Sequence, residues 1–150
     1  IVSHDYHFRE WQPDDRWSFD VPDKKEAMGF SSTTIYLWIV PAHVAGRWQV
    51  EVSGRSAPQP MTLELQQDFQ LVHGTAQLDG RSVELANARL RGDALEFRLR
   101  PGAAGSEQLF HGRIMGNTMQ GEVAWGAGPL AKRSNWKATR VQLPGEPLAR

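Results

Sequence analysis

Apolar and polar residues alternate with a period of two along most of the chain after residue 45. The segment GRWQVEV (46–52) places its Trp and both Val residues on one face, and its Arg, Gln and Glu on the other. The same alternation recurs in MTLEL (61–65) and ALEFRLR (94–100). Further strand-forming segments occupy residues 109–116, 119–125 and 136–141. A period of two is typical of a strand that buries one face, so these segments predict antiparallel β-structure.

Turn signals separate these segments. The dipeptides Asp79-Gly80, Gly92-Asp93 and Gly116-Asn117 suit the positive φ angles of two-residue hairpin turns. Glycines also fall inside the expected strands, where they mark the sharp bends that a small barrel needs. These glycines are Gly74, Gly112 and Gly121. The pattern predicts a mainly β fold, a small antiparallel meander barrel of about eight strands between Gly46 and Val141.

The first 45 residues have a different pattern. Short strands are predicted over Ile1–Phe8 and Arg16–Val21, followed by a polar connection (22–29) with about one helical turn closed by Gly29. The run STTIYLWIVP (32–41) lacks alternation and predicts a strand buried on both faces, as in an α/β sheet. We therefore divide the chain into the closing strands of an α/β domain (1–45), a barrel (46–141) and a tail (142–150).

Composition narrows the classes of function. Seventeen basic and seventeen acidic side chains cancel, which argues against nucleic acid or an anionic membrane surface as a partner. The chain has no cysteine, so thiolate chemistry is excluded. The longest apolar run, residues 35–40, is too short to cross a bilayer, and no leader is visible. We therefore expect a cytoplasmic location. The chain opens with two β-branched residues, which resembles the start of an internal strand.

Potentially reactive side chains gather at the start of the chain, in His4, Asp5, Tyr6 and His7. On a strand, His4 and Tyr6 would share one face, while Asp5 and His7 would share the other. A metal site would need a further ligand from elsewhere, such as Glu10, Asp14 or His43, and we predict none. We expect instead a polar strand end that contacts a small-molecule substrate, because α/β sheets bind ligands beyond the carboxyl ends of their strands. The phosphate-loop, nucleophile-elbow and zinc-protease motifs are absent from the sequence.

The segments IVSHDYHFREWQPDD, VPDK and TTIYLWIVPAHVAGRW resemble the C-terminal region of certain bacterial class I S-adenosylmethionine-dependent methyltransferases. The resemblance covers residues 1–48. It implies that IVSH is the last parallel strand of a Rossmann-like sheet, that IYLWIVP inserts antiparallel, and that a β-domain is appended. The family's glycine-rich loop and acidic residue for the cofactor are not in this sequence. The resemblance therefore implies that S-adenosylmethionine binds only in a longer parent protein, and that this chain alone has no catalytic residue and no activity.

Two alternatives follow from the barrel and from the strand edges. Gly46–Trp48 and Arg140 are similar to the Gly-x-Trp start and the closing arginine of lipocalin-like and avidin-like barrels. Such a barrel would bind a small apolar ligand in a cavity lined by Trp48, Leu63, Phe97 and Phe110. The second alternative is a structural or oligomerisation domain, in which exposed strands at Ile1 and Ile35 pair with another copy of the chain.

Overall fold

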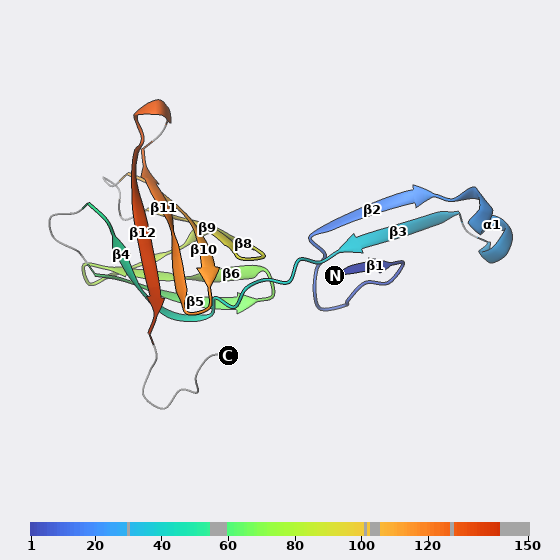
Figure 1. The fold of residues 1–150 in the computed structure, drawn as a ribbon, viewed down its shortest axis with the longest axis horizontal. Helices are drawn as coiled ribbons and strands as arrows, with labels where there is room; N and C mark the ends of the chain where they lie inside the picture. Colours follow the sequence, from blue (N-terminus) through green and yellow to red (C-terminus); the bar gives the residue numbers. More distant parts are fainter. Residues whose placement is uncertain (30, 55–59, 101, 103–105, 127, 142–150) are drawn as a thin grey trace. The chain divides into compact units, whose positions relative to one another are not determined.

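The computed structural model describes residues 1–29, 31–54, 60–100, 102, 106–126 and 128–141. The chain divides into two compact units, Ile1–Val40 and Pro41–Arg150 (Figure 1). The boundary predicted after residue 45 lies just inside the second unit, because Val44 is fully buried in the barrel core. The predicted tail, 142–150, lies outside the described residues.

The first unit is a three-stranded antiparallel sheet with one short helix. Its elements are β1 (Val2–His4), β2 (Asp15–Asp20), α1 (Pro22–Met28) and β3 (Ser32–Leu37). The strand order is β1-β3-β2, and β3 runs antiparallel to both neighbours. In the pairing, Ile35 of β3 lies opposite His4 on one side and Trp17 on the other.

The helix of this unit is short because its sequence begins and ends it closely. Pro22 occupies the first turn, where its missing N–H costs nothing, and Gly29 ends the helix with a φ of 81°. The predicted helical turn closed by Gly29 is confirmed. Within the described part of the chain α1 has no buried residue, and neither α1 nor η1 (Gly128–Leu130) has the length and apolar content to span a membrane.

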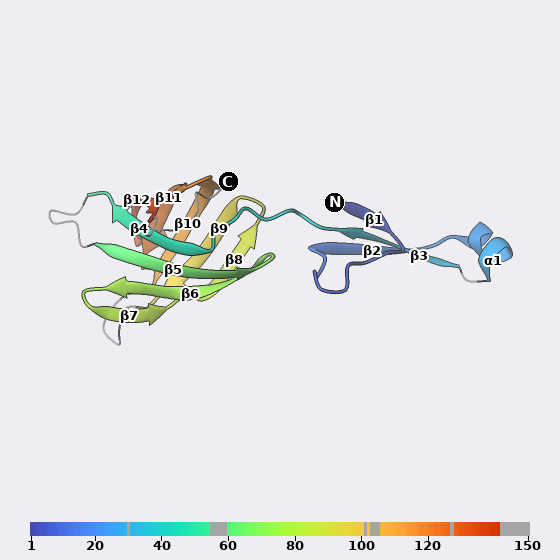
Figure 2. The ribbon, with the colours of Figure 1, turned by 90° about the horizontal axis from the view of Figure 1, so that it is seen from below.

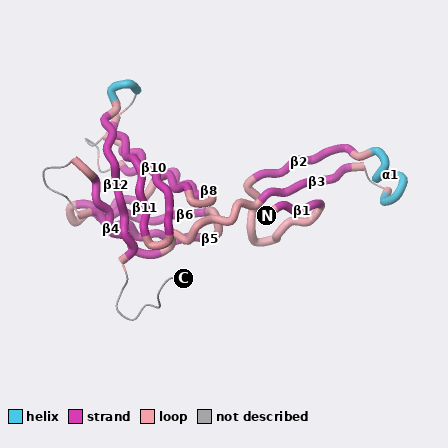
Figure 3. Tube along the Cα trace, in the orientation of Figure 1, coloured by secondary structure: helices cyan, strands magenta, loops and turns pink. Residues whose placement is uncertain are grey.

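Strand β3 is less buried than its unbroken apolar run predicts. Thr33 is buried, but Thr34, Ile35, Tyr36 and Leu37 are only half-buried. The reason is that β1 and β2 lie beside β3 in the sheet, while α1 lies beyond the ends of β2 and β3, so none of these elements covers its faces (Figure 3). The sequence therefore encodes more apolar surface here than the unit itself buries.

The second unit is a nearly closed barrel, which confirms the predicted mainly β meander, with nine strands where about eight were expected (Figures 1 and 2). The strands are β4 (Gly46–Val52), β5 (Met61–Asp68), β6 (Leu71–Leu78), β7 (Arg81–Glu84), β8 (Ala86–Arg91), β9 (Ala94–Leu99), β10 (Gln108–Met115), β11 (Thr118–Trp125) and β12 (Lys132–Arg140). Their order in the sheet is β7-β6-β5-β4-β12-β11-β10-β9-β8. The two end strands, β7 and β8, are consecutive in the chain, and the N–H of Leu85 between them donates to the carbonyl of Gly74 in β6 at 3.0 Å.

The predicted hairpin turns are confirmed. Asp79-Gly80, Gly92-Asp93 and Gly116-Asn117 each join two paired strands, and their glycines have φ angles of 75°, 60° and 62°. A fourth hairpin, between β5 and β6, turns at Phe69 with a φ of 51°. Neither Phe69 nor Gln70 is a typical turn residue, so sequence reasoning gives no turn there.

The barrel interior is packed with large apolar side chains. The Phe97 and Phe110 rings stack with their centroids 4.8 Å apart, and the Trp136 ring meets Phe110 edge-on at 5.6 Å. Trp136 needs the space that Gly112 leaves, because a Cβ there would lie 2.5 Å from the indole. A Cβ at Gly121 would lie 1.8 Å from the carbonyl oxygen of His111. The two strand glycines are thus required by close backbone and ring contacts.

Pairing between β12 and β4 brings the two ends of the meander together, and Arg140 secures this closure. Its guanidinium carbon lies 4.2 Å from the centroid of the Trp48 ring. The same guanidinium donates to the carbonyl oxygens of Ala45 and His43, and to the Asn117 Oδ1 at 3.0 Å. The Trp48 indole donates to the Val44 carbonyl at 2.8 Å, so the chain entering β4 is fixed from both sides.

We expect Arg140→Lys to lower the free energy of unfolding of the barrel by about 2 kcal/mol, because an ammonium group cannot stack on Trp48 while donating to two carbonyls. Urea denaturation followed by circular dichroism measures the change. The matched control is Arg133→Lys, at an exposed ion pair with Glu122, which should cost less than about 0.5 kcal/mol. Equal losses in both variants would contradict a special role for Arg140.

Candidate functional site

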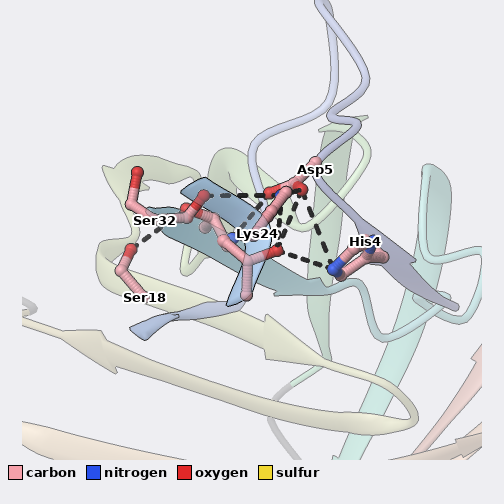
Figure 4. A network of polar contacts seen from close by, with 7 residues as sticks. His4, Asp5, Ser18, Lys24 and Ser32 are labelled. Carbon is pink, nitrogen blue, oxygen red and sulfur yellow. Dashed lines mark hydrogen bonds and ion pairs between the residues drawn. The ribbon is translucent and has the colours of Figure 1, made fainter. Parts of the chain in front are cut away.

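A polar network lies at the carboxyl end of β1 and joins it to β3 and α1 (Figure 4). Asp5 is at its centre. One carboxylate oxygen accepts from the Thr34 backbone N–H at 2.7 Å, and the other accepts from the Thr33 hydroxyl at 2.9 Å and from the Lys24 ammonium. His4 joins through its Nε2, which lies 2.6 Å from the Thr33 hydroxyl oxygen.

The local backbone explains why His4 and Asp5 meet. Strand β1 ends at His4, and Asp5 adopts the left-handed region with a φ of 57°, which Asp tolerates better than most residues. Its N–H still donates to the Thr34 carbonyl at 2.8 Å. The alternation expected through His7 therefore stops at Asp5, and both side chains reach Thr33.

The hydrogen bonds around the Thr33 hydroxyl constrain how His4 takes part in the network. The Thr33 hydroxyl has one proton, which it donates to Asp5, while its lone pairs face the Lys24 ammonium at 3.1 Å and His4 Nε2. With that proton donated to Asp5, it is the His4 tautomer protonated at Nε2 that donates to Thr33. The imidazole is left with Nδ1 as its second polar atom, and the ring is largely exposed, so it has one edge toward solvent.

The other two predicted contact residues, Tyr6 and His7, lie outside this network. The Tyr6 ring meets Phe8 edge-on at 6.0 Å, and His7 lies 5.8 Å from the ring of Tyr36. Further aromatic rings from this loop surround Trp38, which is fully buried and donates its indole N–H to the Trp11 carbonyl at 3.0 Å. The loop after β1 is therefore an aromatic cluster, signalled in the sequence only by its density of aromatic residues.

The electrostatics of Asp5 decide what chemistry the network supports. The Lys24 hydrogen bond, then those from the Thr34 N–H and the Thr33 hydroxyl, hold the pKa of Asp5 well below its ordinary value of 3.8. A carboxylate so strongly stabilised in its charged form is a poor proton acceptor near neutral pH. Asp5 thus positions β1, β3 and α1, and the arrangement supports no general base at this residue.

No group of three or more His, Cys, Asp or Glu side chains within the described ranges is arranged to hold a metal ion. In the barrel, the four residues expected to line a cavity lie in the interior and are fully buried. Phe97 and Phe110 stack on each other, and Trp48 is covered by Arg140. An apolar ligand in the interior would have to displace some of these side chains.

Replacing Asp5 by Asn should loosen the end of β1. Because the folded-state pKa of Asp5 is depressed, its stabilising contribution is present above the unfolded value near 3.8 and is lost as pH falls toward the folded value. We expect Asp5→Asn to lower the protection of the Thr34 amide against hydrogen exchange about tenfold or more near neutral pH, with a smaller difference below about pH 3. The exposed Asp20→Asn is the control, and a pH-independent effect would count against this assignment.

Comparison with protein-family models, with curated proteins and with solved structures finds no significant match to this chain. The arrangement of strands and side chains is therefore the basis on which a function is assigned.

Proposed function

We propose that the first unit is the closing part of the catalytic domain of a bacterial class I S-adenosylmethionine-dependent methyltransferase, and that the barrel is an accessory domain. The observation that carries this proposal is the order β1-β3-β2, with β3 antiparallel to both neighbours. The sequence resemblance implies that IVSH is the last parallel strand and that IYLWIVP inserts antiparallel as the sheet closes, and an antiparallel β3 next to β1 agrees with this.

The apolar surface of the first unit supports the same proposal. Val2, Trp17 and Phe19 are 68%, 44% and 50% exposed. The strand register puts all three on one face of the sheet, together with Ile35 and Leu37. Contiguous exposed apolar side chains of this size mark a surface that another element covers. In the proposed parent protein, the remainder of the Rossmann-like domain covers this face and continues the sheet beyond β1.

The polar network supports a substrate-side role for this unit. His4 and Asp5 end β1, and α/β sheets bind ligands beyond the carboxyl ends of their strands. The ionised Asp5 holds the strand end in place, while His4 presents its free edge outward. These residues would shape the binding of a small-molecule acceptor, which is positioning and not proton transfer.

The cofactor does not fit the residues of this chain. In the described part of the first unit, the connection from β2 to α1 runs through Val21 directly into Pro22 and carries no glycine, and α1 has seven residues. It offers no glycine-rich cradle for a nucleoside ligand. Residues outside this chain would bind S-adenosylmethionine in the cytoplasmic parent protein, and residues 1–150 alone would be inactive.

The barrel supports a second candidate, a small-ligand binding module. Arg140 and Trp48 are the residues that are similar to the closing arginine and the Gly-x-Trp start of lipocalin-like and avidin-like barrels. Arg140 stacks on Trp48 and donates to the carbonyls that precede β4. The buried Trp48, Leu63, Phe97 and Phe110 would line the ligand site. We rank this candidate second because these side chains already pack against one another or against Arg140.

The first test is the reading frame upstream of the Ile1 codon, followed by calorimetric titration of the encoded protein. We expect an upstream strand, glycine-rich loop and acidic strand end, and binding of S-adenosylmethionine by the whole protein but not by residues 1–150. Adenosine triphosphate is the control ligand for the adenosine group. A frame without these elements, or a whole protein that does not bind, would overturn the proposal and favour the binding module.

Phe19→Asp tests whether the exposed apolar face is covered in the parent protein. We expect this variant to lower the free energy of unfolding of the whole protein by about 3 kcal/mol, because it puts a charge into a buried contact. In residues 1–150 alone it should reduce association, measured by light scattering, since the face is then exposed. Gln77→Asp, at an exposed barrel position, should do neither. An unchanged whole protein would contradict coverage of this face.

A further inference from the structure

A hollow of about 920 Å³ lies on the outer face of strands β8–β12, which run side by side (Figure 1). Most of the side chains that line it alternate with the buried residues of the same strands, and the buried Leu95 and Trp136 also border it. Gly112 and Gly121 lie opposite each other in the middle of its lining, and the space beside them is filled by the Trp136 ring and by backbone. We call this hollow the outer groove. It shares no residue with the polar network of β1 or with the barrel interior residues Trp48, Leu63, Phe97 and Phe110.

One cross-strand row of the outer groove is cationic. Arg91 of β8, Arg113 of β10 and Lys137 of β12 occupy this row, with Ala94 and Gln120 on the strands between them. Neighbouring strands lie about 4.8 Å apart, so a cation stands about every 10 Å along the row. The neutral residues in between leave each positive charge separate from the next.

Most cations of the groove have no ionic partner. Within the described residues, Arg89, Arg91 and Lys137 form no ion pair or side-chain hydrogen bond. Arg113 pairs with Asp93 at 2.7 Å, but both side chains are exposed, so the pair contributes little and exchanges readily. The row is therefore available to a carboxylate or phosphate from another molecule.

The neighbouring row argues against a dense polyanion. Glu96 lies 3.2 Å from His111, and Glu122 faces His111 from the next strand. Two carboxylates within the groove would repel a continuous phosphate backbone. Glu122 is already paired with Arg133 at 3.0 Å, and the remaining lone pairs of both carboxylates can accept N–H donors of a peptide. Asn135, opposite Glu122, adds a further donor and acceptor.

The groove also lacks a stacking surface. The one aromatic ring other than His111 among its lining residues, Trp136, is 2% exposed and packs inward on Phe97 and Phe110. Recognition of bases, and commonly of sugars, relies on exposed aromatic faces. The lining is thus suited to discrete anionic groups with peptide-like hydrogen bonding.

We propose that the outer groove binds an extended acidic segment of a partner protein, with carboxylates placed opposite Arg91, Arg113 and Lys137. An extended chain in the polyproline II conformation rises about 3.1 Å per residue with three residues per turn, so acidic side chains at every third position share one face and match the spacing of the cations. Net charge favours an acidic partner, because residues 41–150, which form the groove, carry thirteen basic and ten acidic side chains. Residues 1–40 carry four basic and seven acidic side chains, so the excess of positive charge belongs to the second unit. The proposal does not depend on the methyltransferase assignment.

The test is fluorescence anisotropy of the whole protein with a fluorescein-labelled peptide of four Glu-Thr-Ser repeats at low salt. We expect binding that Arg91→Gln/Arg113→Gln/Lys137→Gln weakens about tenfold or more, since three charge pairs are lost. The matched control, Arg81→Gln/Arg100→Gln/Lys132→Gln, removes the same charge outside the groove and should change affinity less than about threefold. The melting temperatures of both variants should match that of the unsubstituted protein, because only exposed side chains change.

Two further probes make the outcome specific. A peptide of the same composition with its four Glu residues contiguous should bind more weakly than the spaced peptide, and the Gln-Thr-Ser peptide should not bind. Equal weakening by the groove and control variants would reduce the effect to net charge and overturn the proposal. Tighter binding of oligothymidylate than of the spaced peptide, or no peptide binding at millimolar concentration, would overturn it as well.

Discussion

The pairing of β12 with β4 is the contact on which the barrel depends. Every other pair in the sheet joins strands that are close in sequence, whereas this pair joins the two ends of the meander. Arg140 and Trp48 lie at its end, and the guanidinium ties the closing strand to the chain that enters β4. Closure in turn encloses the interior in which Phe97, Phe110 and Trp136 pack, and it gives β8–β12 an outer face with a fixed side-chain register.

The two units differ in how much of their apolar surface they bury. The barrel alternates apolar and polar positions and buries its apolar face internally, so its outer face is free to carry charged rows. The first unit has apolar residues on a face that none of its described elements covers, with Trp17 and Phe19 exposed. Burial of such side chains is a main source of folding free energy, and further elements packed against this face would add that contribution. This contrast links the fold to the methyltransferase proposal, in which those elements belong to the catalytic domain.

Charge is used for two different purposes in the chain. In the first unit, Lys24 and Asp5 are matched within a hydrogen-bonded network, and the pKa of Asp5 is lowered as a result. On the barrel, Arg91 lies in register with Ala94, and Lys137 lies in register with Gln120 and Glu51, and neither cation forms an ion pair within the described residues. Matched charges hold an element in place, whereas unmatched charges in a groove attract a ligand. The first arrangement is therefore structural, and the second offers recognition.

The sequence by itself determined the local structure: the period of two predicted most strands, and Asp79-Gly80, Gly92-Asp93 and Gly116-Asn117 predicted their turns. It determined little of the site, because His4 and Asp5 meet only where the left-handed Asp5 ends the strand and brings both to Thr33. The turn at Phe69 and the outer groove were likewise not predictable. Hairpin turns and alternation are properties of neighbouring residues, whereas the cationic row joins Arg91, Arg113 and Lys137 across β8–β12. Only the register of the folded sheet places these residues, which are distant in the sequence, in one cross-strand row.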